Sequence, residues 1–265
     1  MNKIHVTIHN DYRHLEDFMH EIPAIFSSEG HMIHKGRNEV RIISHGGLDM
    51  AVKRFARNRL PKTLIYTLKG SKAHRAYDNA CRLKAIHLPT PAPVALVEVT
   101  NTTGLVTDSY YICEYTDMAA INSGLNEDND YNRDMTTALA HFVARMHTTG
   151  VLHHDLNTTN VLYRKENDTY AFTLIDINRM TVAADPGKLD LEDCLLNITR
   201  FSRCSEMFCF FVKEYLRVRG LPDTVYDRAI AIKCRHDKAY ARRKKIGGLL
   251  KQIFKRHRAT SPAGI

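Results

Sequence analysis

The segment VLHHDLNTTNVLY, residues 151–163, places an aspartate and an asparagine five residues apart between two short apolar runs. Short apolar runs bounded by polar turn residues are typical of buried strands. The polar stretch between them is therefore predicted to be a loop with both ends held in a core. Asp155 and Asn160 would project from this loop at a fixed separation, although either residue alone is equally well explained as a turn former.

The chain before this loop is predicted to be rich in strands. Apolar patterning predicts three strands in residues 31–57 and one strand each in residues 94–100 and 109–115. Residues 71–86 have the apolar spacing of one helix. The proline-rich segment 88–93 cannot continue that helix.

The rest of the chain is predicted to be mainly helical. Apolar side chains recur at helical spacing in residues 139–146, and Gly150 ends this helix. Residues 189–219 are predicted to be helical again. Between these helical regions, the polar segment 166–169 separates two apolar runs and predicts a β-hairpin.

We therefore expect an α+β fold of two lobes. Residues 1–115 form a small antiparallel sheet with one helix, and residues 116–232 form a larger, mainly helical lobe. The polar stretch 116–133 marks the boundary between the lobes. Residues 233–265 form a basic C-terminal tail.

The basic charge of the protein is concentrated in this tail. Between Lys233 and Arg258 there are 11 Lys and Arg residues and one acidic residue, a balance of +10 within a chain whose net charge is +9. Apolar residues from Ile246 to Phe254 recur at helical spacing. The tail is either a peripheral anchor on an anionic membrane or a terminal helix packed on the large lobe. A nucleic-acid partner has less support, because no interleaved aromatic residues accompany the charges.

Composition excludes several other classes. No run of 18 uncharged apolar residues occurs, and the N-terminus lacks the apolar region of a secretory signal. The six cysteines form no C-x-x-C pair, which favours reduced thiols over a disulfide or zinc framework. We therefore expect a cytoplasmic protein.

Four residues together fit phosphoryl transfer, which needs phosphates to be positioned and their charge to be neutralised. Lys53 lies in a predicted strand and can hold phosphates. Asp155 can orient an attacking hydroxyl group, and Asn160 can bind a metal ion. Asp176 ends a predicted hairpin strand and can complete an Mg²⁺ site. Each residue alone has an ordinary structural explanation, and only the set indicates a function.

The order A-V-K-x-F, H-x-D-L-x-x-x-N and L-I-D-x-N is similar to that of the protein-kinase-like fold over residues 25–179. The resemblance implies that Lys53 is the strand lysine, Asp155 the catalytic-loop base, and Asn160 and Asp176 the metal ligands. ATP and Mg²⁺ are the implied cofactors.

A narrower resemblance rests on the segments IHKGRNEV, SKAHRAYDNACRL, LPTPAPVAL, SYYICEY and HHDLNTTNVLY. These segments resemble the bacterial lipopolysaccharide kinase family, which phosphorylates Kdo or heptose in the inner core of lipopolysaccharide. The implied acceptor is the lipopolysaccharide core or a lipid-linked sugar. It would meet the enzyme at the cytoplasmic face of the inner membrane, where a basic tail could bind.

The resemblance also implies nucleotide contacts. Gly36 is the only glycine in the first strand turn, which lacks a G-x-G-x-x-G motif, so a phosphate cradle must form around it. Glu114 and Tyr115 match the hinge, where backbone groups bind adenine. Asp78 occupies the position of the helix glutamate that pairs with the strand lysine, here Lys53.

Several alternatives remain open. Asp176 is followed by Ile-Asn where protein kinases have Phe-Gly, and no A-P-E segment follows, which argues against peptide substrates. The acceptor could still be a protein or a small molecule such as an aminoglycoside or choline. The chain could also be a silent, nucleotide-binding pseudokinase that binds a partner through its tail. His153 and His154 could bind a metal ion, or one of them could hold the loop, and Asn157 could be a functional or an ordinary loop residue.

Overall fold

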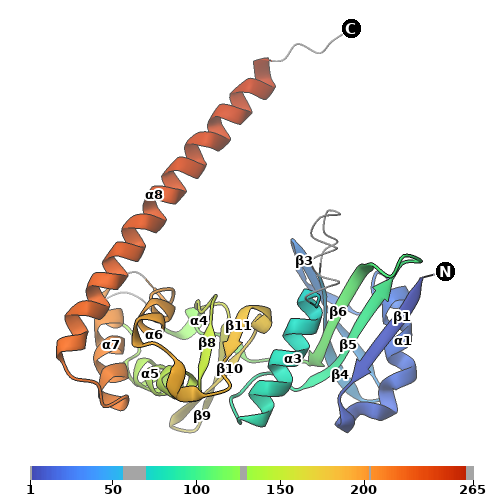
Figure 1. Cartoon of the computed structure of the whole chain (residues 1–265), viewed down its shortest axis with the longest axis horizontal. Coiled ribbons are helices and arrows are strands. Elements are labelled where there is room, and N and C mark those ends of the chain that lie inside the picture. The colour runs from blue at the N-terminus through green and yellow to red at the C-terminus, as the bar shows by residue number, and fades with distance from the viewer. Residues whose placement is uncertain (1, 56–69, 126–129, 203, 261–265) are drawn as a thin grey trace.

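The computed structural model describes residues 2–55, 70–125, 130–202 and 204–260, with residues 247–260 as backbone only. The N-terminal part is built on a six-stranded antiparallel sheet with the strand order β1-β5-β6-β4-β3-β2 (Figure 1). Its strands are Lys3–Ile8 (β1), His31–Lys35 (β2), Asn38–His45 (β3), Leu48–Phe55 (β4), Pro93–Thr100 (β5) and Val106–Glu114 (β6).

The two faces of this sheet meet different helices, because side chains alternate along each strand. Met50 and Val52 of β4 are buried in a small core that contains α1 (Glu16–Ile25). Phe55 lies on the other face, in a larger core that contains α3 (Lys72–Ala85). The larger core continues into the C-terminal part, so α3 connects the sheet to the region that follows it.

The C-terminal part consists of helices around two small sheets, β10-β9-β7 and β11-β8. Its strands are Ala119–Ala120 (β7), Val151–His153 (β8), Val161–Glu166 (β9), Thr169–Leu174 (β10) and Met180–Val182 (β11). Its helices are Asn122–Leu125 (α4), Arg133–Thr148 (α5), Leu191–Ile198 (α6), Glu206–Val218 (α7) and Thr224–Thr260 (α8). Short 3-10 helices are η1 (Asn10–Leu15) in the N-terminal part and η2 (Ile177–Arg179) and η3 (Pro186–Lys188) near the site.

Most of the predicted elements are confirmed. The helix predicted at 71–86 is α3, the hairpin around 166–169 is the β9–β10 pair, and the helical region 189–219 contains α6 and α7. Gly150 follows α5 with φ of +84°, a conformation that glycine adopts without strain. The sequence interpretation did not assign β1, η1 and α1, which add an edge strand and a second helical layer to the sheet.

The long helix α8 is packed on the large lobe at its start and extends away from it towards the C-terminus (Figure 1). The predicted start of the tail at residue 233 falls inside this helix. Side chains from Lys238 to Ile246 are exposed. The remaining apolar positions of the tail, 249, 250, 253 and 254, lie outside the described side chains. Among the described residues, no helix has the length and hydropathy needed to cross a bilayer.

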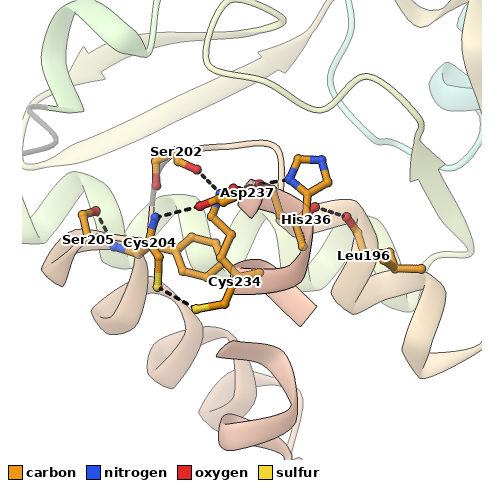
Figure 2. A network of polar contacts seen from close by, with 10 residues as sticks. Leu196, Ser202, Cys204, Ser205, Cys234, His236 and Asp237 are labelled. Atoms are coloured by element: carbon orange, nitrogen blue, oxygen red, sulfur yellow. Dashed lines mark hydrogen bonds and ion pairs between the residues drawn. The ribbon is translucent and has the colours of Figure 1, made fainter. Parts of the chain in front are cut away.

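A buried lysine bonds the start of α8 to the connection between α6 and α7. Asp237 of α8 lies next to Cys204 of this connection (Figure 2). Lys233 is 1% exposed and donates hydrogen bonds to the carbonyl oxygens of Thr199, at 2.8 Å, and Ser202. Its ammonium group also pairs with Asp237 at 2.6 Å, and Asp237 accepts a hydrogen bond from the Cys204 backbone N–H. Because a buried ammonium group is costly unless it is paired, these acceptors fix the position of the α6–α7 connection.

Candidate active site

The site lies in a cavity of about 480 Å³ between the N-terminal sheet and the C-terminal loops. Lys53 reaches it from β4, Asn160 from the loop after β8, and Asp176 from the end of β10. These three side chains are far apart in the sequence, and the fold brings them to one cavity as predicted. Apolar side chains such as Ala51 and Leu162 line the same cavity and leave room for a planar ring.

An ion pair joins the two sides of the cavity. The Lys53 Nζ atom donates to the Asp176 Oδ1 atom at 2.5 Å, and the two side chains are 19% and 35% exposed. Lys53 points to this side because it alternates with Met50 and Val52, which are buried on the opposite face of β4. Asp176 has a left-handed backbone with φ of +55°. Aspartate is one of the residues other than glycine that adopt this conformation most readily.

The loop between β8 and β9 is fixed by its own hydrogen bonds. The Asn160 side-chain amide donates to the Asp155 carbonyl oxygen at 2.8 Å. The Ile175 backbone N–H donates to the Asn160 carbonyl oxygen at 3.0 Å, which places Asn160 beside Asp176. Since the Asn160 nitrogen is occupied, its Oδ1 atom is the group left to bind a ligand in the cavity.

Asn160 and Asp176 together fit an Mg²⁺ ion. They supply one amide oxygen and one carboxylate at the same cavity, and Mg²⁺ is commonly bound by one or two such groups together with phosphate oxygens. In the described parts of the chain, no three His, Cys, Asp or Glu side chains gather at metal-binding distance. An ion here would therefore need ligand oxygens to complete its shell, as expected for a metal that binds with a nucleotide.

His153 holds the loop in place. Its ring is buried, its Nδ1 atom accepts a hydrogen bond from the Asp155 N–H at 3.1 Å, and its Nε2 atom donates to the Ile175 carbonyl oxygen at 2.9 Å. Burial lowers its pKa, so the ring is neutral. Both ring nitrogens are occupied by these hydrogen bonds, so neither is left to bind a metal ion. Of the two predicted roles, His153 therefore has the structural one of holding the loop. His154 is exposed and contacts the Thr181 hydroxyl group at 2.8 Å.

A buried chain of hydrogen bonds continues from His153 into the helical lobe. Asn197 of α6 donates to the His153 carbonyl oxygen at 2.7 Å, and its own Oδ1 atom accepts from His147 Nε2 at 3.0 Å. The His147 Nδ1 atom lies 2.7 Å from the Tyr215 hydroxyl group, which accepts from Arg219 at 2.7 Å. Since arginine only donates, the Tyr215 hydroxyl proton is directed to His147. Burial lowers the pKa of His147 to about 4. The sequence interpretation had assigned no role to this chain.

Asp155 lies at the open side of the loop. Its Oδ1 atom is 3.5 Å from an Arg200 Nη1 atom, and the two side chains are 36% and 47% exposed. Arg200 directly follows Thr199, the residue that caps the end of α6. The Asp155 carboxylate is therefore accessible to a hydroxyl group that enters from solvent.

The predicted contact between Asp78 and Lys53 is wrong. Asp78 points to the exposed face of α3, where it pairs with Arg82 at 3.0 Å, while Lys53 pairs with Asp176. The next residue, Asn79, is buried and donates to the Ile177 carbonyl oxygen at 2.7 Å. The contact between α3 and the segment after Asp176 is therefore made by the Asn79 amide, one residue after the predicted Asp78. The helical spacing of the apolar residues in α3 could have shown that Asn79 lies on the buried face.

The predicted hinge is only partly free to bind a nucleotide. Glu114 and Tyr115 line the cavity, but the Glu114 N–H donates to the Ala92 carbonyl oxygen at 2.9 Å and the Tyr115 N–H donates to that of Asp49 at 2.8 Å. The Glu114 carboxylate accepts from the Tyr12 hydroxyl group at 2.7 Å. The backbone N–H groups of these two residues are therefore already bonded, and the adenine contact at the hinge stays a prediction.

The other two predicted loop residues lie in turns. Gly36 is in the β2–β3 turn, where its N–H donates to the Asn38 carbonyl oxygen at 3.1 Å. From this hairpin, His34 and Asn38 line the cavity, so a phosphate cradle at Gly36 remains a prediction. The Asn157 side chain accepts hydrogen bonds from the Thr159 N–H and hydroxyl groups at 2.9 and 2.6 Å, which explains it as a turn residue.

Comparisons with known proteins agree with this arrangement. The family model "Lipopolysaccharide kinase (Kdo/WaaP) family" matches residues 35–195, which is more than half of the chain. The solved structure "WaaP in complex with acyl carrier protein" has a TM-score of 0.62 and 14% sequence identity, and the match covers 89% of this chain and 98% of that one. A comparison with curated proteins gives no match. The predicted α+β, protein-kinase-like fold is confirmed, and the chain belongs to the lipopolysaccharide kinase (Kdo/WaaP) family.

Proposed function

We propose that this kinase uses ATP and Mg²⁺ to phosphorylate a hydroxyl group of Kdo or heptose in the inner core of lipopolysaccharide. The observation that carries the proposal is the Lys53–Asp176 pair, which spans a cavity also lined by Asn160. Asp155 lies on the same loop as Asn160 and is open to solvent. These are the charged and oxygen-bearing groups that phosphoryl transfer requires.

The residues then have distinct tasks. Lys53 exchanges its contact with Asp176 for the phosphate oxygens of the nucleotide, and Asn160 and Asp176 hold the metal ion. When bound, Mg²⁺ neutralises charge on the transferred phosphate. Asp155 orients the sugar hydroxyl group and accepts its proton as the oxygen attacks the γ-phosphorus atom. The bond between the γ-phosphorus atom and the bridging oxygen of the β-phosphate breaks in the same step, and ADP leaves. The hydrogen bonds of His153 keep Asp155 and the Asp176 segment in register.

The chain after Asp176 supports a small or lipid-linked acceptor. It passes through η2, β11 and η3 and enters α6 at Leu191. This connection pairs closely with β8, because Met180 and Val182 lie opposite His153 and Val151. Such a short, paired segment offers little chain to bind an extended peptide, which favours a sugar over a protein acceptor.

The test is to locate the labelled γ-phosphate of ATP after the purified protein meets separated lipopolysaccharide and protein fractions. Label in the lipopolysaccharide core is the expected result. Label in protein or in a small molecule would replace the proposed acceptor. Mg²⁺-dependent ATP binding without any transfer would instead support a nucleotide-binding pseudokinase.

We further propose that the exposed basic part of α8 brings the enzyme to the cytoplasmic face of the inner membrane. Arg242, Arg243, Lys244 and Lys245 are consecutive and exposed on a helix that extends away from the body. Such clusters are attracted to anionic lipid. The solved WaaP structure is a complex with acyl carrier protein, so a protein partner of this helix is the alternative that a vesicle experiment must separate.

A further inference from the structure

A second cavity is lined by Arg200, the residue whose side chain contacts Asp155. It has a volume of about 320 Å³ and is lined by residues of β8, α6 and α8 and of the segments just after β8 and α6. Its polar lining includes His154, Asp193, Arg200 and His236. It shares no lining residue with the cavity that contains Lys53. Arg200 connects the second cavity to Asp155, since its Nη1 atom is 3.5 Å from the Asp155 carboxylate.

The reaction geometry requires an acceptor site beside Asp155. In phosphoryl transfer the attacking and leaving oxygens lie roughly in line on opposite sides of the phosphorus atom. The nucleotide phosphates are expected beside Lys53, Asn160 and Asp176, in the first cavity. The sugar hydroxyl must therefore approach Asp155 from the side away from the nucleotide. The second cavity is a candidate for that approach, because it shares no lining residue with the first cavity and its Arg200 contacts the Asp155 carboxylate.

The backbone beside Arg200 is anchored by a hydrogen bond, whereas among the described residues its guanidinium group has a single long contact, with Asp155. The preceding residue, Thr199, accepts a hydrogen bond from buried Lys233 at 2.8 Å, which anchors the end of α6 to α8. His236 projects from the same part of α8 (Figure 2). The guanidinium group is 47% exposed and its contact with Asp155 is long for an ion pair. A ligand anion can therefore replace Asp155 as its partner without moving the backbone.

The groups in the cavity suit a sugar that carries a negative charge. Arg200 can bind a carboxylate or phosphate with two parallel hydrogen bonds. His154 and His236 line the same cavity with polar imidazole rings, and Asp193 can accept hydrogen bonds from sugar hydroxyl groups. We propose that this cavity is the acceptor subsite and that Arg200 binds the anionic group of an acidic sugar. The assignment rests on the proposed kinase function and favours an acidic sugar such as Kdo over an uncharged heptose.

The kinetic test compares Arg200→Gln and Arg200→Lys with Arg217→Gln. Arg217 is a matched control, because it is also an exposed arginine paired with a carboxylate, Glu214, but lies on α7. With de-acylated lipopolysaccharide core as a soluble acceptor, Arg200→Gln should raise the acceptor KM by about 10-fold to 100-fold, since a hydrogen-bonded charge is lost. The KM for ATP should stay within about twofold of the wild-type value.

The control variants separate binding from other roles of Arg200. Arg200→Lys should recover part of the acceptor affinity, and Arg217→Gln should match the wild type. Thermal unfolding midpoints establish that each variant is folded. A fall in kcat with an unchanged acceptor KM would overturn the proposal, because Arg200 would then act on Asp155 or on the transferred phosphate.

A direct binding measurement makes the subsite testable independently of turnover. Free Kdo and free heptose are titrated into wild-type protein and Arg200→Gln, and binding is followed by NMR. Binding of Kdo but not heptose, lost in Arg200→Gln, supports the subsite even if no lipopolysaccharide is phosphorylated. Phosphorylation of lipopolysaccharide with the same acceptor KM in all variants would leave the kinase function standing and overturn the subsite. Equal binding of both sugars would overturn the preference for an acidic one.

Discussion

Asp155 contributes a carboxylate whose charge can be removed with almost no change in shape. Asp155→Asn should lower turnover by roughly 10²- to 10⁴-fold, because the amide cannot accept the proton of the sugar hydroxyl group. Binding of Mg²⁺ and ATP should remain close to wild type, since Lys53, Asn160 and Asp176 are unchanged. Single-turnover transfer and nucleotide titration measure the two effects. Turnover at the wild-type level would remove Asp155 from this role.

Two neighbouring residues on α3 should respond in opposite ways. Asn79→Ala leaves the buried Ile177 carbonyl oxygen without its donor and should lower the free energy of unfolding by about 1–3 kcal/mol. Asp78→Asn removes only an exposed pair with Arg82 and should change it by less than about 0.5 kcal/mol. Denaturant unfolding measures both values.

The activity of the same two variants tests the corrected assignment. Asn79→Ala should also reduce turnover, because Ile177 follows Asp176 directly. Asp78→Asn should retain turnover. A large loss of nucleotide affinity in Asp78→Asn would mean that Asp78 does reach Lys53 when ATP is bound.

At the scale of elements, the loop that carries Asp155 is held by helices that lie behind it. The chain from His153 through Asn197 and His147 to Tyr215 joins β8 to α6, α5 and α7. Every member is a buried polar group with a partner, and such networks fix one arrangement because any unpaired member is costly. The packing of the helices therefore adds to the hydrogen bonds that hold the loop carrying Asp155.

This network makes stability depend on pH. Burial lowers the pKa of His147 to about 4 from its usual value of 6.5. Between these two pH values, His147 is protonated in the unfolded chain and neutral in the folded protein. The stabilisation is present above pH 6.5 and is lost as the pH falls towards 4, by at most on the order of 3 kcal/mol. The depressed pKa of His153 acts in the same direction.

The measurement is the free energy of unfolding at several pH values from about 7.5 to about 4.5, a range that spans the titration of His147, compared between wild type and His147→Gln. The glutamine variant is less stable at neutral pH but should lose less stability on acidification, because its side chain does not titrate. Parallel pH profiles for the two proteins would show that His147 is not the group responsible.

The N-terminal helix α1 was not assigned from the sequence, although its buried residues recur at helical spacing. The buried positions are Leu15, Phe18, Met19 and Ile22, a pattern that could have predicted part of α1. Polar and charged residues surround them, and Pro23 lies inside the helix. The helix is stabilised by burial against the sheet rather than by its own propensity, and this packing partner is not visible in the local sequence.

At the scale of the whole molecule, the projecting half of α8 should respond to charge. Replacing Arg242, Arg243, Lys244 and Lys245 by glutamine should weaken binding to anionic vesicles by about 1 kcal/mol for each residue and reduce its salt dependence. Activity on de-acylated, soluble acceptor should not change. Co-sedimentation with anionic and neutral vesicles measures the binding.

Two outcomes would contradict the membrane assignment. Equal binding of wild type and variant to anionic vesicles would exclude these charges as the anchor. Absence of vesicle binding together with charge-dependent binding to purified acyl carrier protein would identify an acidic protein as the partner of α8.

The sequence by itself determined the elements that carry Lys53, Asp155, Asn160 and Asp176. Apolar periodicity placed the strands, the hairpin and α3, and the motif order indicated that the four residues act together. The predicted elements are confirmed because each depends on local apolar patterning, whereas the joint action of the four residues stays a prediction. The cavity then brings Lys53, Asn160 and Asp176 together as predicted.

Only the tertiary structure decided which side chains surround those four residues. Asn79 falls on the apolar face of α3 by helical spacing, but only the packed structure shows that this face meets the Ile177 carbonyl oxygen and that Asp78 pairs with Arg82. Arg200 and Asn197 come from a helix with no motif and the residues just after it, and they reach the loop because α6 packs behind β8. Contacts between distant segments depend on which helix and strand surfaces pack together. The apolar pattern of a single sequence identifies the buried surface of each element but does not identify the element that covers it.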